Sequence, residues 1–254
     1  MNNQKTAAVL LIGDELLSGR TRDINLQTIA TFLAPLGIQV AEARIVSDTE
    51  NQIIAALNQL REQFDYVFTT GGIGPTHDDI TADCVAKAFG DHIDVRPDAL
   101  DLLTEHYSLT GIEFTKPRKR MARIPDSASL IKNPVSTAPG FQIGNVFVMA
   151  GVPSIVRGML EDVGWRLESG AVVQSATLRI KGAREGSLAE KLGEIAKAYP
   201  DLSVGSYPWY GSPEDTGVHI VIRGIDEALM EQAVTDASAM VSEAGLIAER
   251  LSVD

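Results

Sequence analysis

Short hydrophobic runs alternate with helical patterns along the first part of the chain. The runs with the length and composition of buried strands are residues 7–12, 38–46, 65–70 and 146–149. Apolar residues recur at helical spacing over residues 24–36, 53–60, 79–89 and 98–110. Strands that alternate with helices in this way are typical of stacked β-α-β units. The pattern therefore predicts an α/β module with a mainly parallel sheet.

The pattern breaks at residues 164–170 and then changes character. Beyond the break, it predicts a strand, a helix, two further strands and a last helix, at residues 176–180, 187–198, 202–207, 217–222 and 226–244. This order is typical of a small α+β module. We therefore expect two domains, at residues 1–168 and 172–254.

Composition and charge narrow the classes of partner. Hydrophobic residues make up 44% and charged residues 22% of the chain, which is typical of a folded protein. A formal net charge of −12 repels polyanions, so we expect no binding to nucleic acid or to anionic membranes. The run at 7–12 is too short for a membrane span or a signal peptide, which predicts a cytoplasmic protein. Cys84 is the single cysteine, and we expect it in the core.

A glycine-rich loop follows the third predicted strand. Gly71, Gly72 and Gly74 stand between that strand and the helix predicted from residue 79. Glycine lets the backbone approach a ligand closely, and free amides at the start of a helix favour an anion. In open α/β sheets, ligands bind beyond the carboxyl ends of the strands. The loop is a candidate phosphate site, although it matches neither the Walker pattern nor the dinucleotide fingerprint, and a plain tight turn is the alternative.

Polar side chains follow the glycines directly. Thr76, His77, Asp78 and Asp79 place a hydroxyl, an imidazole and two carboxylates beside the presumed phosphate. Carboxylates in that position can hold a divalent metal that bridges phosphate oxygens, or act as a base towards water. The alternative is that Asp78 or Asp79 caps the following helix together with Thr81 and binds nothing.

Further carboxylates follow the first two predicted strands. Asp14 and Glu15 come after the first strand, and Asp48 follows the second. If the first and third strands are neighbours in the sheet, these groups converge with Asp78 and Asp79 on one pocket, as a metal-assisted hydrolase or transferase requires. The alternatives are a polar loop and, for Asp48, a helix cap.

A compact basic segment at residues 116–120 stands out in this acidic chain. Arg118, Lys119 or Arg120 could neutralise charge on a leaving phosphate, and the sequence leaves open which of them does so. The alternative is a solvated surface turn broken by Pro117.

Four segments carry a family resemblance in their order and spacing. They are GDELLSG at 13–19, TTGGIGPTHDDIT at 69–81, TAPG at 137–140 and GVP at 151–153. Together they resemble the CinA (competence/damage-inducible protein A) family and its MoaB/Mog-like molybdopterin-binding domain, and they are similar to the corresponding domain of eukaryotic FAD synthases. GAREGSLAEKL at 182–192 and VGSYP at 204–208 resemble the KH-like domain that follows in CinA proteins. The resemblance implies a MoaB/Mog-like three-layer sandwich followed by a small α+β KH-like domain.

The resemblance also implies a chemistry. In CinA-like and FAD-synthase-like members it is metal-dependent cleavage of ADP-ribose or FAD to AMP and a second phosphate. On that basis the catalytic residues are Asp79, Asp48 and Glu15, the phosphate-binding residues are Gly71, Gly72, Gly74, Thr76 and Arg120, and the metal ligands are Asp14, Asp78 and Asp79. The resemblance leaves the divalent ion open among cobalt, nickel, manganese and magnesium.

A second function remains open from the sequence. The protein could instead bind molybdopterin, or act as an adenylylating accessory protein in molybdenum-cofactor synthesis. Under either function the ligand is a small molecule, an adenine dinucleotide or molybdopterin, and the resemblance implies a homo-oligomer. RNA binding is not expected, because the KH-like part has no clear GXXG loop. Nor is nicotinamide-nucleotide amidase activity expected, because the 254 residues leave no room for that further CinA domain.

Overall fold

The computed structural model describes residues 4–212 and 215–251. The chain divides into two compact units, one up to residue 171 and one from residue 172 on. Residues 1 and 254, at which the sequence-predicted domains begin and end, lie outside the described residues.

A six-stranded sheet forms the middle of the first unit, in the order β2-β1-β3-β8-β7-β6. Its strands are β1 (Lys5–Ile12), β2 (Ile38–Val46), β3 (Tyr66–Thr70), β6 (Ser129–Ile131), β7 (Gly140–Ile143) and β8 (Val146–Met149). The first four strands in that order are parallel, and β7 is antiparallel to both of its neighbours. The mainly parallel sheet predicted from the sequence is confirmed.

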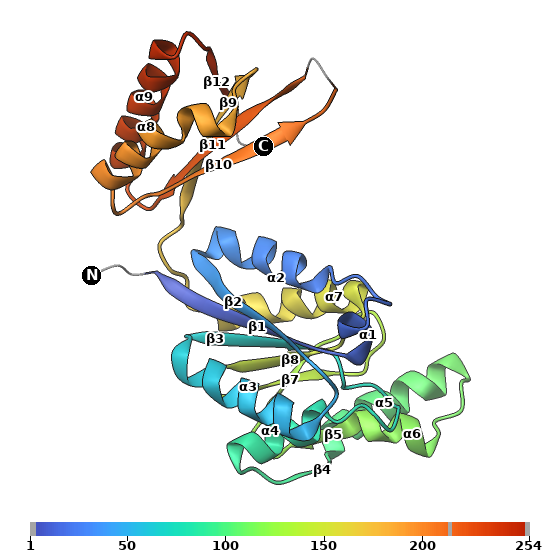
Figure 1. Ribbon diagram of the computed structural model, residues 1–254. Helices are drawn as coiled ribbons and strands as arrows, with labels where there is room; N and C mark the ends of the chain where they lie inside the picture. Colours follow the sequence, from blue (N-terminus) through green and yellow to red (C-terminus); the bar gives the residue numbers. More distant parts are fainter. Residues whose placement is uncertain (1–3, 213–214, 252–254) are drawn as a thin grey trace. The chain divides into compact units, whose positions relative to one another are not determined.

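Helices cover both faces of this sheet (Figure 1). α2 (Asn25–Leu33) and α7 (Pro153–Val163) lie on one face, and α3 (Glu50–Gln63) and α4 (Thr81–Phe89) lie on the other. The two faces follow from the alternation of side chains along β1, because successive residues of a strand point to opposite sides. Val9 and Leu11 pack in the cluster that contains α2 and α7, and Leu10 packs in the cluster that contains α3 and α4. This three-layer arrangement confirms the predicted architecture.

The first unit also contains short elements around its sheet. They are α1 (Asp14–Leu17), β4 (Ile93–Val95), α5 (Pro97–Thr110), α6 (Lys116–Lys119), β5 (Arg123–Pro125) and the 3-10 turns Ala34–Leu36, Arg120–Ala122 and Gly164–Arg166. The sequence pattern did not predict α7 or the short strands β4 to β7. Strands of three or four residues are too short to show an alternating pattern.

The second unit is a small α+β domain, as the sequence predicted. Its antiparallel sheet has the order β10-β11-β9-β12. The elements are β9 (Gln174–Lys181), α8 (Glu185–Ala198), β10 (Ser203–Tyr210), β11 (Thr216–Gly224), α9 (Glu227–Glu243) and β12 (Ala248–Leu251). Both helices pack against one face of the sheet (Figure 1) and bury the side chains of alternate strand residues there. Among the described residues, no helix is long and apolar enough to cross a membrane.

Candidate functional site

The glycine-rich loop lies at the carboxyl ends of β1 and β3, which are neighbours in the sheet. Gly71 and Gly72 have φ angles of 100° and 67°, in the left-handed region that favours glycine. A Cβ at Gly71 would lie 2.1 Å from the carbonyl oxygen of Ile12, and one at Gly72 would lie 2.1 Å from Oγ1 of Thr81. The loop therefore needs glycine at both positions to pass this close to Ile12 and Thr81, whether or not it binds a ligand.

Three buried polar atoms near this loop have no hydrogen-bond partner: Oγ1 of Thr69, Oγ1 of Thr81 and Oδ1 of Asn25. Asn25 is the first residue of α2, and its side-chain nitrogen donates to the carbonyl of Gly151 at 2.7 Å. An unpaired buried polar atom costs about 1–3 kcal/mol, so each marks a place where rearrangement or a ligand could supply a partner. The sequence analysis did not single out Asn25 as a site residue, because a polar residue at a helix start is typical of a cap.

Carboxylates converge at the same edge of the sheet. Oδ2 of Asp48 accepts a hydrogen bond from the backbone N–H of Asp14 at 2.9 Å. Burial raises the pKa of Asp48, and the charges of Asp14, Glu15 and Asp78 raise it further, while the bond from the Asp14 amide opposes them. The charges of three carboxylates identified in the sequence therefore act on a fourth, Asp48. The pairing of β1 with β2 places Asp14 beside Asp48, and the expected pairing of β1 with β3 places the loop that carries Asp78 at the same edge.

The carboxylate of Asp79 has a different environment. It accepts a hydrogen bond from the backbone N–H of Thr76 at 2.7 Å and a second one from the Thr76 hydroxyl. Asp79 thus closes the loop on itself, and α4 begins two residues later than predicted, at Thr81, without a side-chain cap. In the described ranges, no three His, Cys, Asp or Glu side chains are grouped so that they could hold a metal ion by themselves. The predicted metal ligands stay a prediction. His77, which could have joined them, is 98% exposed.

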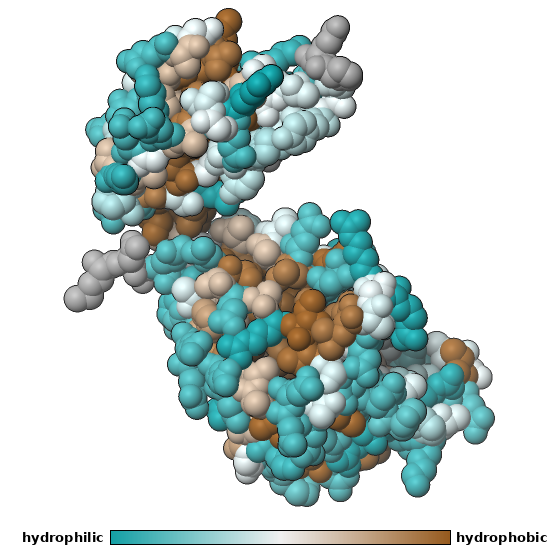
Figure 2. Space-filling view, in the orientation of Figure 1, coloured by the Kyte–Doolittle hydropathy of each residue, from teal (hydrophilic) through white to brown (hydrophobic). Residues whose placement is uncertain are grey.

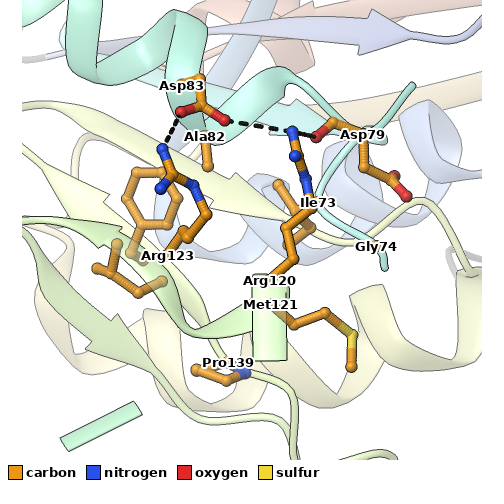
Figure 3. A pocket seen from close by; sticks show the side chains of 11 residues that line it. Ile73, Gly74, Asp79, Ala82, Asp83, Arg120, Met121, Arg123 and Pro139 are labelled. Atoms are coloured by element: carbon orange, nitrogen blue, oxygen red, sulfur yellow. Dashed lines mark hydrogen bonds and ion pairs between the residues drawn. The ribbon is translucent and has the colours of Figure 1, made fainter. Parts of the chain in front are cut away.

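A pocket opens on the other side of this loop (Figure 3). It is small, with a cavity volume of about 20 Å³, and Gly74 and Asp79 lie on its wall. Nη2 of Arg120 donates to the backbone oxygen of Asp79 at 3.1 Å and lies 3.4 Å from Oδ2 of Asp83. Arg123 forms a second ion pair with Asp83, at 2.5 Å. Two guanidinium groups therefore share one carboxylate at the edge of the glycine-rich loop.

Of the three cations proposed from the basic segment, Arg120 is the one that lines this pocket. Arg118 donates to the carbonyl of Glu113 and lies over the ring of Tyr107, at 5.2 Å from its centroid. Lys119 lies over a neighbouring aromatic ring. The segment forms a short helix and a 3-10 turn in which Lys116, Pro117 and Lys119 are exposed, so a surface turn stays the alternative. Arg123, three residues beyond Arg120, was missed because it lies outside the compact basic run.

The TAPG segment contributes a strained residue next to the pocket. Thr137 has a φ of 66°, which non-glycine residues adopt at a cost of about 1 kcal/mol or more. Its hydroxyl pairs with Nδ1 of His106 at 2.9 Å, and its backbone N–H donates to the carbonyl of Asn133 at 3.0 Å. Pro139, two residues further on, lines the pocket. The strain is therefore held by contacts from α5 and from the loop itself.

The carboxylate cluster makes a prediction about stability and pH. Asp48→Asn keeps an acceptor for the Asp14 amide and removes one negative charge. Because the pKa of Asp48 is raised in the folded state, its ionised form opposes folding above that pKa and does not once it is protonated. We expect the variant to be more stable than the wild type at pH 7, by no more than about 1 kcal/mol because the group is partly solvated. The gain should shrink as the pH falls through the acidic range.

Thermal unfolding of both proteins between pH 7 and pH 4 measures this difference. Asp101→Asn, at an exposed position of α5, is the matched control and should shift the midpoint little at either pH. A variant at Asp48 that is less stable than the wild type at pH 7 would show that the charge is compensated.

Comparison with known proteins gives two family matches. The family described as "Probable molybdopterin binding domain" matches residues 8–168, and the one described as "FAD synthase, middle domain" matches residues 173–250. A protein from Pyrobaculum arsenaticum is 37% identical, over 80% of this chain and 79% of its own length. A CinA-like protein from Geobacter metallireducens is 33% identical over 93% of this chain, which spans only 59% of that relative. The crystal structure of the protein CinA with unknown function, from Thermoplasma acidophilum, is 35% identical with a TM-score of 0.59, and the match covers 65% of this chain and 99% of that one.

Proposed function

This chain belongs to the family of probable molybdopterin binding domains, as a CinA-like protein that also carries an FAD synthase middle domain, and from that premise we propose that its first unit is a nucleotide pyrophosphatase. The proposed substrate is ADP-ribose or FAD. One observation supports this most directly: the loop that Arg120 contacts through the backbone oxygen of Asp79 also carries Asp78, whose charge acts on Asp48. A pyrophosphate needs both kinds of group, cations for its oxygens and acids that act on water.

The arginines fit the phosphate side of the reaction. Arg120 and Arg123 now share Asp83, and the bond from Arg120 is long, at 3.4 Å. A phosphate group in the pocket would compete with Asp83 for these guanidinium groups, and charge-assisted bonds to phosphate are among the strongest hydrogen bonds in proteins. A Cβ at Gly74 would lie 2.7 Å from Oδ2 of Asp79, so this glycine lets the Asp79 carboxylate lie close to the loop. In this proposal Arg120 neutralises charge that develops on the leaving phosphate.

The carboxylates fit the second requirement of the reaction, which is a metal ion or a base that acts on the attacking water. Burial and the charges of Asp14, Glu15 and Asp78 raise the pKa of Asp48, so a divalent cation or a proton beside Asp48 would be favoured. A magnesium-type ion commonly takes one or two carboxylates and completes its shell with water and substrate phosphates, so the missing three-residue group does not argue against it. Such an ion would polarise a phosphate oxygen. A water molecule then attacks one phosphorus, the P–O–P bond breaks, and AMP leaves with ribose 5-phosphate or FMN as the other product.

Release of AMP from ADP-ribose and from FAD tests the proposal. The assay is run with cobalt, nickel, manganese or magnesium, and with a chelator. We expect metal-dependent release, and Asp79→Asn should abolish it while the thermal unfolding midpoint stays close to that of the wild type. Unchanged turnover in this variant would remove Asp79 from the catalytic site. Absence of release with every metal would reject the pyrophosphatase.

Molybdopterin binding is the second candidate, and the match of residues 8–168 to that family favours it. It needs the glycine-rich loop and the arginines, but not a carboxylate that acts on water. The two candidates separate in the same assay, because a binding protein retains affinity for a pterin pyrophosphate without releasing AMP.

The proposal includes a cytoplasmic homo-oligomer. Hydrophobic surface gathers on the face of the first unit where α1 and β2 lie (Figure 2), and exposed Leu17 and Ile45 belong to these elements. Apolar patches of this kind commonly mark protein contacts. Because α1 carries Asp14 and Glu15, a second copy packed here would lie next to the carboxylates.

A further inference from the structure

The sheet of the second unit has one face that its own helices leave open. α8 and α9 bury Leu178, Ile180, Val218 and Ile220 on the other face. Residues paired across an antiparallel sheet point to the same side, and successive residues point to opposite sides. Register therefore shows which side chains the open face carries.

Two rows of this face hold aromatic and basic side chains. In the first row, Tyr207 pairs with His219, and His219 pairs with Arg179. In the second row, Trp209 pairs with Gly217, and Gly217 pairs with Lys181. The rows are adjacent on the same face, because Tyr207 and Trp209 are two residues apart on β10. This set of residues, Tyr207, Trp209, His219, Arg179 and Lys181, is called the ring face below.

The side chains of Trp209, His219 and Arg179 pack against one another on this face. The indole of Trp209 stacks on the imidazole of His219, with centroids 4.5 Å apart and planes 22° from parallel. The guanidinium of Arg179 lies 4.9 Å from the centroid of the indole. A Cβ on Gly217 would lie 2.3 Å from Cη2 of Trp209, so the glycine makes room for the ring. Tyr207 is 50% exposed beside this stack.

The charges of the ring face suit an anion of small size. Lys181 has no acidic group within 4.0 Å among the described residues, while Arg179 already pairs with Asp215 at 3.0 Å. Within the described residues, one cation without an acidic partner and one shared cation match a single phosphate group, whereas a chain with a net charge of −12 repels a long polyanion. Aromatic side chains on an open sheet are a common stacking surface for nucleotide bases.

We propose that the ring face binds a nucleoside monophosphate, with its base stacked on the aromatic side chains and its phosphate bound by Lys181 and Arg179. All five residues of this site belong to the second unit, and the proposal does not depend on the activity of the first unit.

Trp209 itself reports on the site. The chain has two tryptophans, so Trp165→Phe leaves the fluorescence of Trp209 alone. Titration of this full-length variant with AMP should quench the emission to saturation. Adenosine, which lacks the phosphate, and ribose 5-phosphate, which lacks the base, should each bind at least about tenfold more weakly, since each loses one of the two interactions.

The chain offers matched controls for both interactions. Tyr207→Ala and Lys181→Gln should each weaken AMP about five- to tenfold. Tyr210→Ala removes an exposed ring from the opposite face of the same strand, and Arg223→Gln removes a cation four residues beyond His219 on the same face. Neither control should change the affinity. Arg120→Ala in the first unit should leave the quenching unchanged.

Three results would overturn the proposal. The first is no quenching by AMP at millimolar concentration. The second is equal weakening by the control variants, which would indicate a general effect of charge or stability. The third is a single-stranded oligonucleotide that binds the ring face far more tightly than AMP, because the occupant would then be a polymer. Thermal unfolding of each variant shows whether a lost signal comes from a lost fold.

Discussion

Arg120→Ala should lower kcat/KM for AMP release by about 100-fold or more, which corresponds to about 2.7 kcal/mol of transition-state stabilisation. The reason is its position: the guanidinium lies in the pocket, beside the loop glycines, and bonds to the backbone of Asp79. Steady-state kinetics with ADP-ribose measure the effect. If the first unit only binds its ligand, the same variant should instead weaken binding, as calorimetry would show.

Arg118→Ala is the control for this prediction. It removes the same charge two residues away, from a side chain that lies over Tyr107 instead of in the pocket. A general loss of positive charge would affect both variants alike, whereas a phosphate contact at Arg120 affects one. Equal kinetics for the two variants would contradict the assignment. Because Arg120 also contacts Asp83, thermal unfolding should accompany the kinetics.

The sequence predicted those parts of the fold that depend on one local cause, such as the burial of a strand or the steric need for glycine. Buried parallel strands such as β1 and β3 are continuous hydrophobic runs, and glycines mark the loop where the backbone cannot accept a Cβ. From these features the sheet type could be predicted, whereas the three layers were implied by the family resemblance and the position of the site stays a prediction. The contact between Asp14 and Asp48 depends on the pairing of β1 with β2, and the approach of the loop after β3 depends on the pairing of β1 with β3.

Other features depend on contacts that the sequence does not encode locally. The bonds from Thr76 to the carboxylate of Asp79 depend on the path of a non-helical loop, which the sequence pattern does not predict. Asp79 does not cap α4, and its expected role as a metal ligand stays a prediction. Arg123 comes to the pocket through pairing of β5 with β4 and through Asp83 of α4. The stack of Trp209 on His219 depends on the register of β10 and β11, which is a long-range property.

Gly71 belongs both to the candidate site and to the packing of the central strands, so a substitution there affects stability as well as ligand binding. Gly71 follows β3 directly, contacts the end of β1 and hydrogen-bonds to Met149 of β8 through its N–H. These three strands form the middle of the sheet. A change at Gly71 therefore acts on the fold before it acts on a ligand, so loss of activity there would not by itself identify a phosphate contact.

Gly71→Ala should destabilise the protein by about 3 kcal/mol or more. The new Cβ would lie 2.1 Å from the carbonyl oxygen of Ile12, and both partners are backbone atoms that cannot rotate away. Gly90→Ala is the matched control: its φ of 66° is also in the left-handed region, but a Cβ there meets nothing within 4 Å. The control should cost only the left-handed penalty of about 1 kcal/mol. Denaturant unfolding measures the loss of stability in both variants. Equal losses would show that the strands separate enough to admit a methyl group at Gly71. The close contact with Ile12 would then not be the reason for glycine at this position.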